Sequence, residues 1–249
     1  MYNLNNGLID YLFSDGAVSW VFHLTFILMA VAVIAISYLL GSINSAIIIS
    51  RVMYHDDVRT HGSGNAGMTN MLRTYGKNAA LLTLLGDLLK TAVAIFIAGV
   101  LFGFNYYQGL SMGLGFTYVA ALFAVIGHVF PIYYKFRGGK GVLSTATALL
   151  ILSPFVFLIL FALFAAIVGA SKYVSLGSVS AVVLLPVLIR GQFAIYGAPM
   201  SILTSLSLVI IAVLIVWCHR GNLQRISNRT ENKLSFGKKK TEDVSGDAE

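Results

Sequence analysis

Long charge-free runs of apolar residues alternate with short polar segments along this chain. About 20 apolar residues in a helix cross the hydrocarbon core of a bilayer, so runs of this length predict membrane crossings. The predicted crossings have the approximate bounds 16–50, 78–101, 110–134, 141–171, 174–189 and 198–218. Residues 51–77 and 135–140 are the main polar segments between them, and 102–109 is typical of a turn.

The run 141–171 is too long for a single crossing. One helix over it would measure about 46 Å at 1.5 Å per residue, against a core of about 30 Å. Ser153 and Pro154, near its middle, can divide it into two short tilted helices. With this division there are seven crossings, and an outside N-terminus gives an inside C-terminus.

The distribution of basic residues supports seven crossings. Of the 17 lysines and arginines, all except Lys90 and Arg190 then lie on the inside, as the positive-inside tendency requires. We therefore predict an all-α, polytopic integral membrane helix bundle with seven transmembrane helices, its N-terminus outside and its C-terminus in the cytoplasm. The membrane domain would cover residues 1–236, and a disordered polar tail would cover 237–249.

Composition excludes several classes of protein. Hydrophobic residues make up 57% of the chain and charged residues 11%, whereas a soluble domain carries roughly 25% charged residues. A single soluble domain and a disordered chain are both excluded. Cys218 is the only cysteine, so an intramolecular disulfide and a cysteine-based metal site are excluded as well. We expect no cofactor, metal ion or nucleic-acid partner, and no cleavable signal peptide.

The clearest chemical motif is RGGKG at 137–141, on the predicted inside face. Gly138, Gly139 and Gly141 permit positive φ and close backbone approach. Successive backbone N–H groups around Lys140 could hold an anion, and a helix beginning at Val142 would strengthen the site. The alternative is a flexible turn whose cations face anionic lipid.

A second glycine-rich segment, GSGNAGMTNMLR at 62–73, lies on the same predicted face. It combines Ser63, Asn65 and Asn70 with Arg73, which could grip a phosphate with two hydrogen bonds. Such a loop suits an oxyanion or a polyol. The alternative is an Asx or Ser turn that caps a helix starting near Thr69.

Polar residues near the C-terminus join this face. His219 and Asn222 are three residues apart and share one side of a helix. A histidine there could act as a general base or an orienting donor, or it could be an ordinary interfacial side chain. Glu231 is expected to pair with Arg225 or Arg229 and so to fix the tail.

Three ionisable residues fall inside predicted crossings. Asp87 and Lys90 can pair across one turn of the second crossing, and charges within a membrane are functional candidates by default. The pair could instead only lock helix packing. His128, beside Gly127, could shape the 135–141 segment or bond to a neighbouring helix.

Together these motifs resemble those of the bacterial acyl-phosphate:glycerol-3-phosphate acyltransferases. The matching segments are GSI, GSGNAGMTNMLR, LLTLLGDLLK, GHVFPIYYKFRGGKG, KYVSLGS, HRGN and TEN, in order across about residues 38–233. The resemblance implies a seven-helix enzyme of the bacterial cell membrane with its site facing the cytoplasm. It would transfer a fatty acyl chain from acyl phosphate to the sn-1 hydroxyl of glycerol 3-phosphate, the first step of phospholipid synthesis. The products would be lysophosphatidic acid and phosphate, and a soluble enzyme that makes the acyl phosphate would be a coupled partner.

The resemblance also implies roles for individual residues. Ser63 and Arg73 match an essential serine and arginine, and Gly138, Gly139, Lys140 and Gly141 match a phosphate-binding loop. His219 and Asn222 match a polar pair, and Glu231 matches a structural acid. Lys172 stands where arginine is frequent, and we expect it to contact phosphate without the bidentate geometry of arginine. The other departures from the family pattern are Asn44, Ala66, Met68 and Gly221.

For the chemistry, we favour direct attack by the glycerol hydroxyl, with His219 or a substrate phosphate oxygen taking the proton. A Ser63 acyl-enzyme is the rival mechanism. A transporter of organic phosphates or lipids is the alternative function, but its sites would lie near the midplane between repeated halves, and no repeat is evident. A scaffold leaves the glycine loop unexplained. No histidine has an aspartate five residues on, which argues against H-x4-D acyltransferase chemistry.

Overall fold

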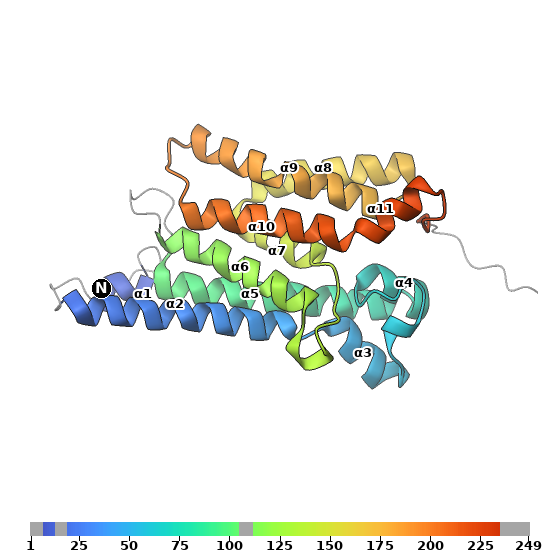
Figure 1. The fold of residues 1–249 in the computed structure, drawn as a ribbon, viewed down its shortest axis with the longest axis horizontal. Coiled ribbons are helices and arrows are strands. Elements are labelled where there is room, and N and C mark those ends of the chain that lie inside the picture. The colour runs from blue at the N-terminus through green and yellow to red at the C-terminus, as the bar shows by residue number, and fades with distance from the viewer. Residues whose placement is uncertain (1–6, 13–18, 105–111, 235–249) are drawn as a thin grey trace, which may run out of the picture.

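Long helices lie side by side, and three short helices gather at one end of the bundle, namely α3 (Ser45–Tyr54), α4 (Met68–Tyr75) and α11 (Arg220–Ser227) (Figure 1). The computed structural model describes residues 7–12, 19–104 and 112–234. The elements in these residues are α1 (Gly7–Leu12), α2 (Ser19–Ser42), α3 (Ser45–Tyr54), η1 (Val58–Thr60), α4 (Met68–Tyr75), α5 (Lys77–Phe102), α6 (Met112–Val129), η2 (Ile132–Tyr134), α7 (Val142–Leu152), α8 (Pro154–Ser171), α9 (Val174–Ile195), α10 (Ile202–Cys218) and α11 (Arg220–Ser227). The predicted all-α class is therefore confirmed for the described residues. The predicted tail, 237–249, and most of the predicted turn at 102–109 lie outside them.

The first predicted crossing is one candidate span, Trp20–Tyr54, but its helix is interrupted. α2 ends at Ser42 and α3 begins at Ser45. The side chain of Asn44 accepts a hydrogen bond from the N–H of Ile47 at 3.1 Å, which makes Asn44 the N-cap of α3. The charge-free pattern did not reveal this break, because a polar cap inside an apolar run changes hydropathy very little.

The predicted division at Ser153 and Pro154 is present. α7 ends at Leu152, and the N–H of its C-cap residue Ser153 donates to the carbonyl of Leu149 at 2.8 Å. Pro154 is the first residue of α8. Proline suits that position because its missing N–H would be unpaired there anyway. α7 has 11 residues and is therefore about 16 Å long, too short to cross the hydrocarbon core alone.

The outer surface of the bundle is strongly apolar. Within the described residues, five segments are long and apolar enough to cross a membrane, or six if the bent α10–α11 pair counts as one span. Their outward side chains include Trp20, Leu89, Phe155, Val187 and Val213, which are between 64% and 70% exposed. Burying such side chains from water is worth about 25 cal/mol per Å² of apolar area, so this surface is suited to lipid.

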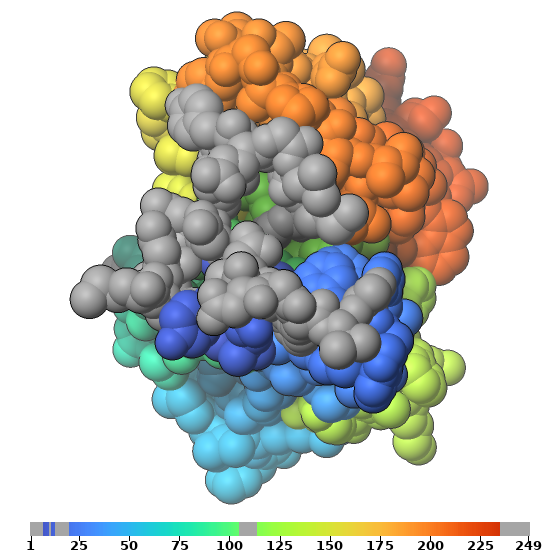
Figure 2. Space-filling view, turned by 90° about the vertical axis from the view of Figure 1, so that its left-hand side faces the viewer, coloured from blue at the N-terminus to red at the C-terminus, as the bar shows by residue number. Residues whose placement is uncertain are grey.

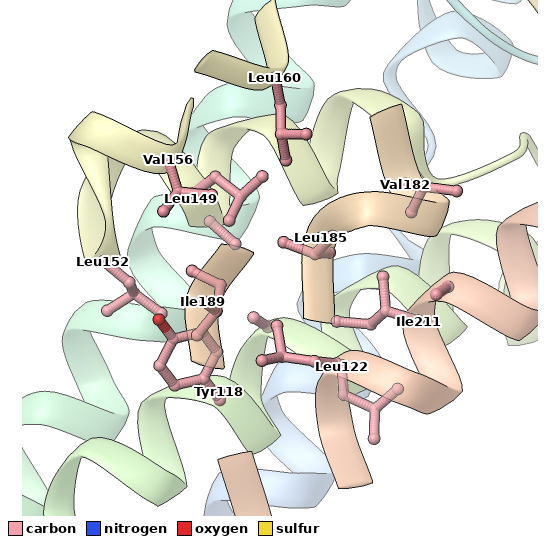
Figure 3. Close-up of a cluster of buried hydrophobic side chains, with 14 of the residues drawn as sticks. Tyr118, Leu122, Leu149, Leu152, Val156, Leu160, Val182, Leu185, Ile189 and Ile211 are labelled. Carbon is pink, nitrogen blue, oxygen red and sulfur yellow. The ribbon is translucent and has the colours of Figure 1, made fainter. Parts of the chain in front are cut away.

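An apolar core joins α6, α7, α8, α9 and α10. Figure 3 shows side chains from all five helices converging, among them Leu122, Leu149, Leu160, Leu185 and Ile211, all of them buried. Because these helices hold one another through this core, the ends of α7, α9 and α10 keep fixed positions relative to each other.

Close backbone contact joins α2 to α6. A Cβ on Gly127 would overlap the carbonyl oxygen of Tyr38, and a Cβ on Gly41 would overlap the backbone of Ala124. Small residues at helix contacts permit this close approach.

Figure 2 views the end of the bundle where α2 begins and where α9 meets α10, opposite the end that carries α3, α4 and α11.

A buried ammonium group connects α2, α5 and α6. Lys90 Nζ lies 2.9 Å from Asp87 Oδ1 and 3.0 Å from His128 Nδ1. It also donates to the carbonyl oxygens of Gly41 at 3.1 Å and Ile43 at 2.8 Å, at the break after α2. These two carbonyls lie at the C-terminal end of α2, where backbone carbonyls lack a partner within the helix. The charged pair is therefore compensated, as buried charges must be.

We expect Lys90→Met to destabilise the bundle by about 3–5 kcal/mol, the cost of leaving a buried charge without its partner. Asp87→Asn combined with Lys90→Met should recover a large part of this loss, because no unpaired charge then remains. The apparent unfolding temperature in detergent, followed by tryptophan fluorescence, measures both effects. A double variant no more stable than Lys90→Met would contradict the role given to the pair.

Candidate active site

A cavity of about 420 Å³ opens at the end of the bundle that carries α4 and α11. Its polar part is lined from four separate parts of the chain, by Arg73 of α4, Lys140, Ser175 of α9, and the pair His219 and Asn222. The cavity therefore brings together side chains that lie up to 168 positions apart in the sequence, counted from Ser63 to Glu231. The fold makes one site from the motifs on the predicted inside face.

Lys140 belongs to a chain of hydrogen bonds. Its Nζ donates to Asn222 Oδ1, and Asn222 Nδ2 donates to Glu231 Oε1 at 2.6 Å. Glu231 also accepts from Ser175 Oγ at 2.9 Å and pairs with Arg225 Nε at 2.8 Å. The Arg225 pairing agrees with the structural role expected for Glu231. Because one side of Asn222 meets a cation and the other a carboxylate, its amide has a single orientation.

The charges in this chain are shifted by their surroundings. Burial lowers the pKa of Lys140 to about 8, and the Glu231 carboxylate limits that fall. Burial would raise the pKa of Glu231, but hydrogen bonds from Asn222, Arg225 and Ser175 outweigh it and hold this pKa below its ordinary value. At neutral pH the site thus contains an ammonium group whose positive charge is only partly compensated.

The glycine loop works differently from the expectation. The N–H of Gly138 donates to Val129 at 3.1 Å, and the N–H of Gly139 donates to His128 at 3.0 Å. The last carbonyls of α6 need partners, so these two N–H groups are used within the protein and do not form an anion cradle. The remaining anion-binding elements are Lys140 and the N-terminus of α7, which begins after Gly141.

The three glycines are required for two different reasons. Only Gly141 has a positive φ, of 80°, which makes it the left-handed residue before α7. At Gly138 a Cβ would overlap the carbonyl oxygen of His128, and at Gly139 it would overlap His128 Nε2. Close packing on the end of α6, and not backbone conformation, thus excludes side chains at 138 and 139.

Asn70 organises the first glycine-rich loop. Its Oδ1 accepts from the N–H of Ser63 at 3.0 Å, and its Nδ2 donates to the carbonyls of Val58 at 3.0 Å and His61 at 2.9 Å. Asn70 is buried, and its amide is used in folding the loop. Ser63, Asn65 and Arg73 line the cavity as a result. The helix begins at Met68 without a side-chain cap, so the capping alternative is not what this loop does.

His219 ends α10 and is buried, with 3% of its surface exposed. Its Nδ1 lies 2.8 Å from the carbonyl oxygen of Ile215. A carbonyl can only accept, so Nδ1 carries the proton and, in the neutral ring, Nε2 has a free lone pair. His219 lines the cavity beside Asn222, as their spacing predicted.

Four predicted residues do not line the cavity, namely Lys90, Gly138, Gly139 and Lys172, and Ser175, which does line it, was missed. Lys172 is the left-handed C-cap of α8, with φ 65°; its side chain is exposed and does not line the cavity. Lys172 thus does not reach the cavity in this structure, and its predicted contact with phosphate stays a prediction. Ser175, three residues on, bonds to Glu231 instead. The segment KYVSLGS signalled this region, but the helical phase that selects Ser175 was not visible in it.

Asp87 and His128 also line the cavity, and Lys90 lies behind them. In the part of the chain that the structure describes, no group of three or more His, Cys, Asp and Glu side chains is arranged to hold a metal ion. The polar part of the cavity therefore offers hydrogen-bond donors and cationic groups. These are suited to anionic oxygen atoms.

The rest of the cavity is apolar. It continues between α7, α8 and α9, where its walls include Leu149, Leu160, Phe161, Val182 and Leu185. Four of these belong to the core shown in Figure 3, where they are labelled. A cationic head joined to an apolar extension, within a bundle of lipid-facing helices, defines a membrane protein that accommodates an anionic amphiphile.

Comparison with known proteins identifies the family: the chain belongs to the glycerol-3-phosphate acyltransferases, whose family model matches residues 31–229. It is 40% identical over 205 residues to glycerol-3-phosphate acyltransferase of Coxiella burnetii, covering 82% of this chain and 97% of that protein. It is also 40% identical over 205 residues to glycerol-3-phosphate acyltransferase 2 of Bacillus cereus, covering 82% of this chain and 94% of that protein.

A solved structure is similar over most of its length. This is the crystal structure of PlsY (YgiH), an integral membrane glycerol 3-phosphate acyltransferase, in its glycerol 3-phosphate form. The identity is 30% and the TM-score 0.72, covering 83% of this chain and 96% of that one. The protein is thus a multi-pass membrane acyltransferase that acts on glycerol 3-phosphate in phospholipid synthesis.

The pKa of Lys140 predicts how activity depends on pH. We predict that the protonated amine binds phosphate, so kcat/KM for glycerol 3-phosphate should fall as pH rises through about 8, approaching a tenfold loss per pH unit above it. Initial rates between pH 6.5 and 9.5, corrected for spontaneous donor hydrolysis, give the profile. Lys140→Arg keeps its charge over this range and should lack the alkaline loss; an unchanged profile in that variant would assign it to another group.

Proposed function

We propose that this enzyme transfers a fatty acyl chain from acyl phosphate to the sn-1 hydroxyl of glycerol 3-phosphate, giving lysophosphatidic acid and phosphate. One observation carries the proposal: the cationic head around Lys140 and the α7 N-terminus is continuous with an apolar channel between α7, α8 and α9. Acyl phosphate has the same division, with a phosphate at one end and an alkyl chain at the other. The acceptor also carries a phosphate.

The reaction needs little activation of the donor, because an acyl phosphate is a mixed anhydride. The hydroxyl oxygen of glycerol 3-phosphate forms a bond to the acyl carbonyl carbon, and the bond from that carbon to the phosphate oxygen breaks. Phosphate leaves with the electron pair, and the hydroxyl proton passes to His219 Nε2 or to a substrate phosphate oxygen. The protein mainly supplies proximity and stabilisation of charge.

The site residues divide this work. Lys140 and the N-terminus of α7 hold a phosphate, and Arg73, at the mouth, supplies a second cation. Arg73 makes only one long hydrogen bond among the described residues, of 3.4 Å to the carbonyl of Asn232, so its guanidinium retains donors for substrate. Asn222 and Glu231 hold Lys140 in place, and Asn65 lines the same head. One solved form of PlsY is named for glycerol 3-phosphate and another for lysophosphatidic acid, which supports this pair of ligands.

Direct transfer is favoured over a Ser63 acyl-enzyme. Ser63 donates its backbone N–H to Asn70, while in the described part of the chain no side chain hydrogen-bonds to its Oγ. An enzyme that uses serine as a nucleophile normally places a base within hydrogen-bond reach. We assign Ser63 to contact with substrate oxygens.

We also propose the topology that the sequence predicts: seven crossings over residues 1–236, with the N-terminus outside and the C-terminus in the cytoplasm. α7 then takes the place of the fourth crossing, as a short helix that does not reach across the whole core by itself, and α8 forms the fifth. The site faces the cytoplasm of a bacterial cell. Its basic loops lie at one end of the bundle, as the positive-inside tendency requires. Acyl phosphate from a soluble enzyme would reach the site from that side.

A donor assay tests the function. The purified protein should release phosphate and form lysophosphatidic acid from acyl phosphate and glycerol 3-phosphate, because the cavity head binds a phosphate on the donor. Acyl-CoA and acyl-carrier protein, offered in parallel, should give no product. Lys140→Ala should raise KM for glycerol 3-phosphate about tenfold or more. Product formed from acyl-CoA but not from acyl phosphate would contradict the proposal.

A trapping experiment separates the two mechanisms. With radiolabelled acyl phosphate and no acceptor, direct transfer predicts no label on the protein after denaturation. Ser63→Ala should still turn over slowly, since it loses a contact and not a nucleophile. Label that is released by hydroxylamine and absent from Ser63→Ala would show an acyl-enzyme. Wild-type protein incubated with the radiolabelled free fatty acid sets the background.

A further inference from the structure

His219 and His128 both line the cavity, and their surroundings fix opposite tautomers. In His219 the partner of Nδ1 is the carbonyl oxygen of Ile215, which can only accept. Nδ1 therefore carries the proton and Nε2 has a lone pair. Under His128 the partner of Nδ1 is the Lys90 ammonium group, at 3.0 Å. An ammonium group only donates, so Nδ1 of His128 must present its lone pair.

The neighbours of Lys90 support this tautomer. Four acceptors surround Nζ within 3.1 Å: the Gly41 and Ile43 carbonyls, Asp87 Oδ1 and His128 Nδ1. These stabilise the charged amine, which has only three hydrogens to share. An Nδ1–H on His128 would point at this cation. The other neighbour of His128 Nδ1 is Asp87 Oδ1, which lies 3.8 Å away, beyond hydrogen-bond distance.

The proton of the neutral His128 ring is therefore on Nε2, which lies against the phosphate loop. A Cβ on Gly139 would overlap Nε2, so the residue that precedes Lys140 is packed directly on this atom. Among the described residues Nε2 has no hydrogen-bond partner, whereas Nδ1 is bound to Lys90. A donor of fixed direction is thus held without a protein acceptor beside the anion-binding head.

We propose that His128 Nε2–H donates a hydrogen bond to a phosphate oxygen in the head of the cavity, with Lys90 and Asp87 as the positioning residues that fix its tautomer. This inference rests on the proposed function, since it concerns the phosphate of glycerol 3-phosphate or of acyl phosphate. His219 Nε2 has a lone pair that can accept the hydroxyl proton, whereas His128 only donates. The buried Lys90 prevents His128 from becoming a second base that would compete for the same proton.

Two matched variants separate the donor from the scaffold. In His128→Gln the side-chain NH₂ can reach the position of Nε2, whereas in His128→Asn the amide oxygen can accept from Lys90 but no donor reaches the loop. We expect His128→Gln to stay within about threefold of wild-type kcat/KM, and His128→Asn to lose about 10- to 100-fold, as for a hydrogen bond to a charged group. A rise in KM for one substrate assigns the contact to the phosphate of that substrate. An active His128→Asn with an inactive His128→Gln would overturn the proposal.

A spectroscopic measurement tests the tautomer without any variant. In the full-length protein labelled with ¹⁵N-histidine, His128 should show a protonated Nε2 and an unprotonated Nδ1, and His219 the reverse. Inorganic phosphate should shift the His128 Nε2–H resonance. Assignment of the proton to Nδ1 of His128, or no shift at saturating phosphate, would overturn the proposal. Because neither result depends on turnover, failure of the donor assay would contradict only the proposed reaction.

Discussion

The buried ammonium group of Lys90 constrains the part of the fold on which the site depends. It joins the carbonyls after α2 to Asp87 of α5 and His128 of α6. α6 in turn holds the glycine loop, since its last carbonyls accept the N–H groups of Gly138 and Gly139. An unpaired charge in this position would cost several kcal/mol. The contacts of Lys90 therefore persist only while all of its partners are in place. Because the glycine loop is bonded to the end of α6, these contacts also hold the loop in position.

A second network, on the other side of the cavity, positions Lys140 itself. Glu231 accepts hydrogen bonds from Asn222 and Ser175 and pairs with Arg225. Through these bonds the segment after α11 is connected to α9 and, by way of Asn222, to Lys140. Burial lowers the pKa of Lys140, but the Glu231 carboxylate limits the fall, so the pKa stays above 7 and the amine is cationic at neutral pH. The contacts of Lys90 thus hold the backbone of the site, and the contacts of Glu231 set the position and the pKa of Lys140.

The sequence predicted the chemistry of the site better than its geometry. The motifs at 62–73, 137–141 and 219–222 line one cavity, in agreement with the prediction that they gather on one face. What each residue does there was not predictable. Lys172 and Ser175 show why: the left-handed cap at Lys172 turns its side chain outward, and three residues later Ser175 bonds to Glu231. Backbone conformation at a helix end is not encoded in residue type alone.

By itself the sequence determined the helical class, the division at Ser153 and Pro154 and the polar inventory of one face, because hydropathy and charge act through local composition. Only the tertiary structure decided where α2 breaks, why Gly138 and Gly139 lack side chains, and which nitrogen of His128 and His219 carries a proton. The tautomer of His128 depends on Lys90, which is distant in sequence, and Gly138 and Gly139 pack on the end of α6. The cap at Asn44 and the bond from His219 to Ile215 are local, but the residue types alone do not select them. A carbonyl under one imidazole and an ammonium group under the other give the same residue type opposite roles.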